Sequence, residues 1–594
     1  MKIHIINILF LAIILSLCAG CEKLTDQEIY KRPDWLPGKL YTTVSLQENL
    51  TMFTECLRLT GLDKILDVSG SWTVFAPTDE AMKQFLAENH YAGISDIPIA
   101  ELERITEFHV IQNPWSLDQL QSLGANGWRS GDNTNANSYA YKRETMLKNP
   151  IEKYWIKKAK NKEMIVMDST ISDGYKRVYV QSRKYVPVFY DEYLKINGLT
   201  SEDYRFYFNR AFEPGNVYYA DAKILKSDIL AENGFVHTID RVVRPMQNAK
   251  ELLEKELPGE TYKLFMEMIY WYYPNFELNK LATFNQPEVR LGGLVDSLWD
   301  LNYSDLAFPL HMELTGYKGP NDNQTLVRHN GLFVPTDDAF RPFIDGILTA
   351  KSGFPHWANQ KSLPQDIVKI IITQNFRSSP IYPSTSQYKE IFKKGNRYYQ
   401  NEESIISKEF GSNCTFMGLN TYIPDRVFTS VTGPVFCRPN FSIFRRALLY
   451  SGAIDAIANH TGKLYFFPIP DYAFMGDSSL ILNWINKEEE IFNFQVLNKL
   501  TRQVENVGSG TLRNWILNQV GVSTGGAGTA KETIRTLGGN NITWDHTNNT
   551  IRGPYPCTAG YKSRIVTTCK PGPLDEPTDN GKTLSVGYWF NFTE

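Results

Sequence analysis

The feature that most constrains the fold of this 594-residue chain is a short stretch that occurs three times. It reads FAPTDEAM from Phe75, FVPTDDAF from Phe333 and, with more changes, FPIPDYAF from Phe467. In each copy an apolar β-type run stops at a proline, which cannot donate a ladder hydrogen bond, and an acidic helix start follows. The matching aspartates Asp79, Asp337 and Asp471 are 258 and 134 residues apart. The spacing predicts a repeating unit of about 130 residues, with insertions in the earlier copies.

We interpret the repeated stretch as a structural joint between a strand and a helix. Thr78 is placed to cap the helix, while Asp79 and Glu80 put negative charge at the positive end of its dipole. In the third copy Pro470 replaces the capping threonine, so we expect Asp471 to take over as the cap. Because the acidic start recurs in each repeat, we assign these aspartates to folding and not to catalysis.

A helix is expected before each joint. The stretches NLTMFTECLRLTGL from Asn49 and NFSIFRRALLYSGA from Asn440 match in pattern, and each ends at a glycine, Gly61 or Gly452. The candidate N-caps are Asn49 or Thr51 in the first copy and Asn440 or Ser442 in the third. In the second copy we expect this helix at about 262–271.

Two further segments recur after each joint. Helices are predicted at LERITEFHV from Leu102, IVKIIITQNF from Ile367 and LRNWILNQV from Leu512. Closing strands are predicted at NGFVHTIDRVVRP from Asn233, NTYIPDRVF from Asn420 and NGKTLSVGYWF from Asn580.

The joint and the segment GFVHTIDRVV resemble the two signature boxes of the fasciclin-like domain family. The resemblance implies an α+β fold of tandem fasciclin-like domains, each a β-sandwich or wedge with packed helices. It also implies an adhesion or binding role at the cell surface, without catalytic activity. The family's Tyr-His pair is replaced by Phe108-His109, Gln374-Asn375 and Asn518-Gln519 in the three copies. These departures argue against an adhesion role for that pair in the later copies.

The N-terminus resembles a bacterial lipoprotein signal. A lysine precedes an apolar run at residues 5–17, which suits a secretion signal and is too short for a membrane span. Two small residues then precede Cys21, the predicted lipid attachment site, with Cys18 as a weaker rival acceptor. Together with the fasciclin-like boxes, this start is similar to that of fasciclin-domain surface lipoproteins of Bacteroidetes bacteria.

These patterns divide the chain into five parts. The predicted parts are a signal peptide at 1–20, a tether at 21–39, a first domain at 40–248, a second at 249–430 and a degenerate third at 431–594. The first domain has an insertion at about 126–228 and the second at about 274–323. In the first insertion, KRVYVQSRKYVPVFYDEYLKI predicts an extra hairpin that leads into a helix, as a binding face or as a decorating subdomain.

Export to an oxidising compartment permits disulfides. The candidate pairs are Cys414 with Cys437 and Cys557 with Cys569, and Cys56 is expected to stay free on the apolar face of a helix.

No pattern points to catalysis, a metal or a cofactor. The sequence GVSTG at 521–525 fits G-x-S-x-G, but a helix precedes it where a strand is required. The nine histidines show no metal-binding spacing. We interpret His109 and His237 as hydrogen-bonded inside the domain, with exposure at a partner site as the alternative. The balance of 62 basic and 65 acidic residues gives no basic footprint for nucleic acid.

We therefore expect a non-enzymatic protein held in the outer membrane by an N-terminal lipid and exposed at the cell surface, where it binds a protein or glycan partner. One alternative is an accessory lipoprotein of a TonB-dependent importer, a transporter complex of the outer membrane, that captures peptides or glycans. A surface hydrolase with a site in the first insertion is the other alternative.

Overall fold

The computed structural model describes most of the chain outside the N-terminus and parts of the insertions. The described residues are 33, 35–68, 70–124, 127–128, 142–148, 152–157, 164–165, 175–180, 183–255, 261–278, 299–303, 306–311, 325–326, 329–348, 356–379, 402–474, 480–486, 491–497, 501–523, 530–553, 557–559, 564–566 and 571–586. The predicted signal peptide, Cys21 and Cys569 lie outside these residues, as does most of the second insertion.

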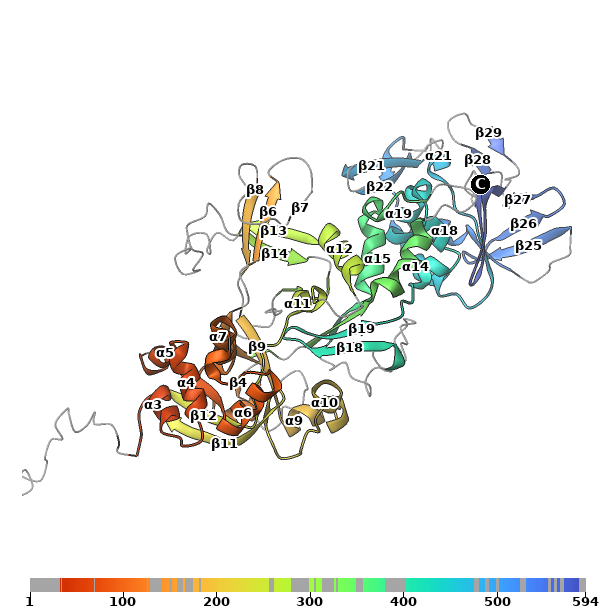
Figure 1. Cartoon of the computed structure of the whole chain (residues 1–594). Helices are drawn as coiled ribbons and strands as arrows, with labels where there is room; N and C mark the ends of the chain where they lie inside the picture. Colours follow the sequence, from red (N-terminus) through yellow and green to blue (C-terminus); the bar gives the residue numbers. More distant parts are fainter. Residues whose placement is uncertain are drawn as a thin grey trace, which may run out of the picture.

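The three repeats share one arrangement of four strands. In the first repeat the order is β2 (Val110–Gln112), β1 (Trp72–Pro77), β12 (Gly234–Ile239) and β11 (Ala222–Ala231). In the second it is β17 (Phe376–Ser379), β16 (His329–Pro335), β19 (Cys414–Leu419) and β18 (Ile405–Phe410). In the third it is β24 (Val520–Val522), β20 (Leu464–Phe466), β31 (Gly581–Val586) and β30 (Pro571–Thr578). The central pair is parallel each time, and both outer pairs are antiparallel. Figure 1 labels β11 and β12 of the first repeat and β18 and β19 of the second.

The predicted helices are present in all three repeats. Those before the joints are α4 (Thr51–Leu59), α12 (Lys263–Tyr272) and α19 (Ser442–Ser451). Those that start at the joints are α6 (Asp79–Glu88), α14 (Asp337–Leu348) and α21 (Asp471–Phe474). Those that follow are α7 (Ile99–Phe108), α15 (Gln365–Thr373) and α22 (Ser509–Leu517). This mixture of helices and sheets confirms the predicted α+β fold.

Thr78 caps α6 as predicted, because its hydroxyl accepts from the Ala81 N–H at 3.2 Å. The joint aspartates also cap the helix that precedes each joint, which was not expected. The carboxylate of Asp79 accepts hydrogen bonds from the Met52 backbone N–H at 2.8 Å and from the Thr51 hydroxyl at 2.7 Å, at the start of α4. Asp337 accepts from the Leu264 N–H at 2.8 Å and from the Thr261 hydroxyl, at the start of α12.

The third joint follows the same geometry. Asp471 accepts from the backbone N–H groups of Ser442 and Ile443, at 3.0 and 2.9 Å, at the start of α19. The expectation that Asp471 caps its own helix is therefore wrong, as are the N-caps expected within the stretches before the joints. The N-cap positions of α4 and α19 are Leu50 and Phe441, which make no side-chain cap, so the aspartate from the joint satisfies these N–H groups.

The closing strand of the second repeat lies earlier than predicted. It is β19, Cys414–Leu419, whereas the segment from Asn420 contains the short helix α17 (Arg426–Thr429). The asparagine just before this strand is Asn413, and its Oδ1 accepts a hydrogen bond from the Ala249 N–H at 2.9 Å. Asn233 and Asn580 bind the N–H groups of Leu40 and Val431 in the same way.

Insertion strands complete the first sheet. They are β5 (Lys142–Lys148), β9 (Arg183–Phe189) and β10 (Tyr218–Tyr219), and pairing of β5 with both β2 and β9 closes the sheet on itself. The expected hairpin is wrong, because β8 (Tyr175–Val180) pairs with β6 (Glu152–Lys157) while β9 pairs with β5 and β10. All but the first residue of β9 are buried, which suits a strand inside a sheet, and the expected helix follows as α9 (Asp191–Ile196).

Apolar cores join neighbouring repeats. One buried cluster combines Phe75 and Tyr219 of the first repeat with Phe410 and Met417 of the second. Another runs through the second and third repeats. Because burial of apolar surface is the main source of stability, the described repeats support one another across these shared cores.

Three of the described cysteines, Cys56, Cys414 and Cys437, are free thiols. Cys414 is buried at the start of β19 and Cys437 is partly buried after α18 (Gly433–Phe436), and both are free, so the predicted pair between them is wrong. Cys56 is free and buried on α4, as predicted, and burial raises its pKa to about 12. The pair of Cys557 with Cys569 falls partly outside the described residues. Among the described helices, none has the length and apolar character needed to cross a bilayer.

Candidate functional site

His109 is a buried structural residue at the end of α7. Its Nδ1 donates to the Ile105 carbonyl at 2.7 Å, and its Nε2 accepts from the Val243 N–H at 3.1 Å. Burial lowers its pKa to about 4, so the ring is neutral at pH 7 and both nitrogens are occupied. The interpretation of His109 as an internal hydrogen-bonded residue is confirmed.

His237 on β12 is also buried and hydrogen-bonded through both ring nitrogens. Its Nε2 donates to the Trp115 carbonyl at 2.9 Å, and its Nδ1 accepts from the Asp228 N–H at 3.2 Å. Burial lowers its pKa as well, and its ring stacks on Phe75 with centroids 5.2 Å apart. Neither family-like histidine is therefore free to contact a partner.

The pairs that replace the family's Tyr-His motif lie inside every repeat. The carbonyls of His109, Asn375 and Gln519 accept from the N–H groups of Phe75, Phe333 and Phe467 at 2.9, 3.0 and 2.9 Å. All three side chains are buried. These positions hydrogen-bond the joint strand to its neighbour in each sheet, and their buried side chains are not available to a partner.

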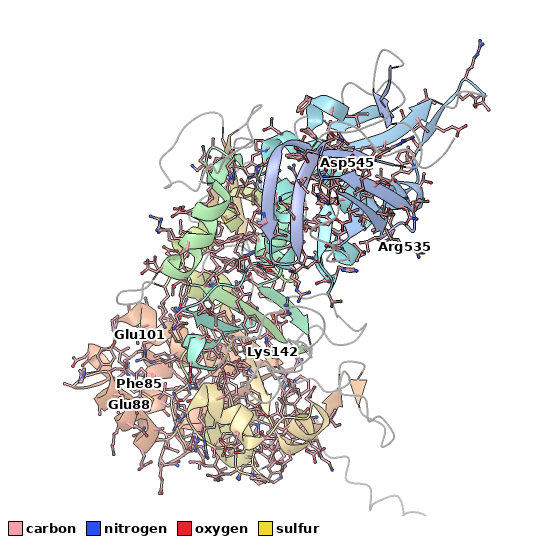
Figure 2. All side chains as sticks on the ribbon, turned by 90° about the vertical axis from the view of Figure 1, so that its right-hand side faces the viewer. Phe85, Glu88, Glu101, Lys142, Arg535 and Asp545 are labelled. Carbon is pink, nitrogen blue, oxygen red and sulfur yellow. The ribbon has the colours of Figure 1, made fainter. Side chains whose placement is uncertain are left out.

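A cleft of about 730 Å³ lies where the first repeat meets the second. One wall is formed by α6 and α7, with Phe85, Glu88 and Glu101 among its residues; these three are labelled in Figure 2. The chain segment 241–247 runs along the cleft after β12, and α11 (Ala249–Leu253) and β18 contribute from the second repeat.

Three pairs of opposite charges lie along this cleft. Arg241 binds Asp221 at 2.9 Å, Lys255 binds Glu409 at 3.0 Å, and Arg104 lies 3.8 Å from Glu251; these are N···O distances. A further arginine, Arg244, is exposed, and its guanidinium carbon lies 5.5 Å from the centre of the Phe85 ring. The lining of the cleft therefore presents charges of both signs to a ligand.

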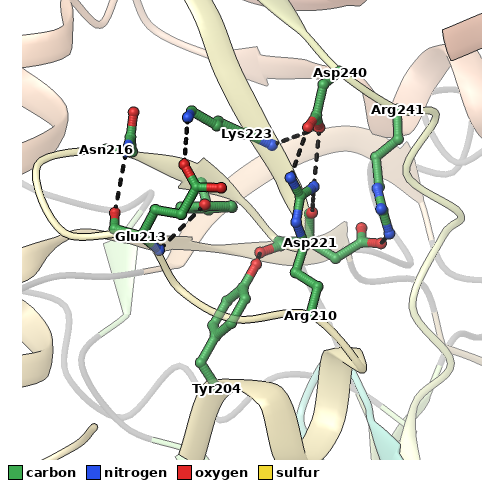
Figure 3. A network of polar contacts seen from close by, with 10 residues as sticks. Tyr204, Arg210, Glu213, Asn216, Asp221, Lys223, Asp240 and Arg241 are labelled. Atoms are coloured by element: carbon green, nitrogen blue, oxygen red, sulfur yellow. Dashed lines mark hydrogen bonds and ion pairs between the residues drawn. The ribbon is translucent and has the colours of Figure 1, made fainter. Parts of the chain in front are cut away.

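A polar network holds the β10–β11 turn that carries Asp221 (Figure 3). Arg210 binds both carboxylate oxygens of Asp240, at 3.2 and 2.8 Å, and donates to the Asp221 carbonyl at 3.0 Å. The Tyr204 hydroxyl donates to the Ala220 carbonyl at 2.8 Å. Burial raises the pKa of Asp221, and its hydrogen bond with Arg241 opposes this rise. The charge pair thus sits on a fixed, partly desolvated turn.

Two buried lysines of the insertion strands fix the second repeat against the first. Lys184 on β9 donates to Glu251 at 2.6 Å and to the Met246 carbonyl at 2.7 Å. The same Glu251 accepts from the Asn248 N–H at 2.8 Å and so caps α11. Lys142 on β5 donates to the Ser412 carbonyl at 2.6 Å. The insertion strands of the first repeat are therefore tied to the segment at 246–251 and to Ser412.

The described lining of the cleft carries charged side chains of both signs. Its described lining has five carboxylates and four basic side chains, but no serine, threonine, cysteine or histidine that could serve as nucleophile or imidazole base. Within the described residues, no cluster of three metal-ligating side chains is found. Sequence reasoning missed this cleft, and its only local signal is the pair of arginines in RVVRP, Arg241 and Arg244.

Comparison with known proteins gives a family match within the first repeat. Residues 48–174 match the family model of the fasciclin domain. Among solved structures, a FAS1 domain pair from the insect cell adhesion molecule Fasciclin I matches at 13% identity, covering 64% of this chain and 95% of that chain, with a TM-score of 0.17. A TM-score this low carries no argument about geometry or function. A search of curated proteins finds no match.

Proposed function

We propose that this chain is a lipid-anchored, non-catalytic binding protein of the cell surface, because residues 48–174 match the family model of the fasciclin domain. Fasciclin domains generally act in cell adhesion or binding. The observation that supports a binding role here is the cleft between the first and second repeats, which is lined by charges of both signs and by partly buried ion pairs. Its partner in this proposal is a protein or glycan at the cell surface.

The anchor in this proposal is a lipid on Cys21, and removal of its thiol tests it. We expect Cys21→Ala to abolish labelling by a radioactive lipid precursor and to release the chain from the membrane fraction. Cys18→Ala is the matched control, because it removes the neighbouring thiol and should leave labelling unchanged. Full labelling of the Cys21→Ala variant would refute the anchor.

The partner is tested by affinity purification of the intact lipoprotein from outer membranes. In the adhesin form of the proposal, a surface protein or glycan copurifies and no transporter does. Stoichiometric recovery of a TonB-dependent importer would replace the adhesin by an importer accessory protein. Hydrolysis of a peptide or glycan by the purified chain would contradict the non-catalytic role.

A further inference from the structure

We propose that the cleft between the first and second repeats binds an extended polypeptide segment that carries both acidic and basic side chains. This inference rests on the proposed binding function and names the class of ligand. It follows from the charges that the cleft leaves available, from its volume, and from the hydrogen bonds and ion pairs that fix parts of its lining.

The available charges have opposite signs and lie on different elements. Arg244, on the segment after β12, is exposed and contacts the face of Phe85, so its guanidinium can donate hydrogen bonds to a ligand carboxylate. Glu88, at the end of α6, is exposed. Its carboxylate accepts a hydrogen bond from the uncharged Gln84 amide at 2.7 Å, so it can also bind a ligand ammonium or guanidinium. A segment that spans these positions needs a side chain of each sign.

Other classes of ligand fit this lining less well. The Phe85 and Phe410 rings are only 4% and 8% exposed and Phe208 is half-buried, so the lining offers at most one ring on which a sugar could stack. Outside the three ion pairs, the lining has Glu88 and Glu101, which repel a polyanion such as a nucleic acid, and Arg244, which repels a polycation. A polypeptide with acidic and basic side chains can pair with the basic and the acidic side chains of the lining at the same time.

The size and rigidity of the cleft suit a short segment of chain. Its volume of about 730 Å³ lies in the usual range for ligand sites. Lys184 is fully buried and binds Glu251 of α11, and Arg210 and Asp240 hold the turn that carries Asp221, so these parts of the lining are fixed before a ligand arrives. Such preorganisation reduces the entropy lost on binding.

The test is fluorescence anisotropy with the full-length chain in detergent. The probe is a labelled octapeptide of alternating lysine and glutamate, compared with octalysine and octaglutamate. We expect the alternating peptide to bind at least about fivefold more tightly than either control, because a gain of roughly 1 kcal/mol corresponds to that ratio. We also expect its affinity to fall as salt rises, since the contacts are charged.

Two single variants locate the site, and a third is the control. Arg244→Ala and Glu88→Ala should each weaken binding of the alternating peptide by about fivefold, the loss of one charged contact. Both side chains are exposed, so the melting temperature should not change. Arg535→Ala, on β25 (Lys531–Thr536) of the third repeat, removes an equally exposed arginine and should change nothing.

Three results would overturn the cleft proposal. They are no binding of the alternating peptide, equal binding of the single-charge peptides, and unchanged binding by both cleft variants. If any of these occurs while Cys21-dependent anchoring and partner recovery persist, the cleft assignment fails and the proposed surface binding function stands. If anchoring and partner recovery also fail, the proposed function fails with it.

Discussion

Replacement of Asp79 by alanine tests whether the joint aspartates serve the fold by capping the preceding helix. Asp79→Ala removes the acceptor for the Met52 N–H and for the Thr51 hydroxyl, while the hydrogen bond from the Asp79 N–H to the Asn49 carbonyl remains. Loss of a helix cap costs about 0.5–2 kcal/mol, and hydrogen bonds to a charged group contribute about 1.5–3 kcal/mol. Because the site is partly exposed, we expect a loss of about 2 kcal/mol.

Glu80→Ala is the matched control. Glu80 is exposed in the first turn of α6, where it interacts with the helix dipole, so its removal should cost only about 0.3–0.5 kcal/mol. Asp79→Asn keeps one acceptor oxygen and should fall between the two, at about 1 kcal/mol.

The assay is amide hydrogen exchange at Met52, read beside chemical denaturation. A chain of several repeats need not unfold in one step, so exchange at the capped helix reports the local loss directly. We expect faster exchange through α4 in Asp79→Ala and little change in Glu80→Ala. Equal effects of the two variants, or protection of Met52 unchanged in Asp79→Ala, would refute the capping role.

Two further predictions concern the first sheet and the buried histidines. A Cβ on Gly234 would lie 1.8 Å from the Trp72 carbonyl oxygen across the β1–β12 pair, so Gly234→Ala should lower the free energy of unfolding by about 3 kcal/mol in denaturant titrations. Gly346→Ala, in open space on α14, should not destabilise the chain, and a similar loss there would contradict the steric explanation. The pKa of His109 is about 4 in the folded chain, below its unfolded value of 6.5. The stability that folding gains from a neutral His109 is therefore fully present above pH 6.5 and is lost as pH falls towards 4, by about 3 kcal/mol in total. His109→Asn should therefore show a smaller loss of stability between pH 6.5 and 4, and an unchanged slope would contradict this assignment.

The sequence predicted the repeating elements because each carries a local signal. An apolar run that ends in proline before an acidic helix start marks the joints, and Asn-Gly marks the closing strands of the first and third repeats. Only glycine fits at Gly234 and Gly581, because a Cβ there would lie 1.8 and 1.9 Å from a carbonyl oxygen of the facing strand. In the second repeat this signal is replaced by Asn413-Cys414, and the closing strand was therefore predicted too late.

The features that sequence reasoning missed depend on contacts between distant segments. The Asp79 carboxylate reaches residues 27 and 28 positions earlier, although its local context suggests a dipole role on its own helix. Strand β9 pairs with β5 because its buried residues fill a closed sheet, whereas its alternating sequence alone resembles half of a local hairpin. The cleft is formed by elements of two repeats, so no single motif could predict it.

The claim that this chain acts as a surface binding protein is tested most directly by biotinylation of intact cells with a membrane-impermeant reagent. We predict that the wild-type chain is labelled on intact cells and that the Cys21→Ala variant is lost from them. Labelling of the wild-type chain only after the outer membrane is permeabilised would place it in the periplasm, and would contradict binding at the cell surface.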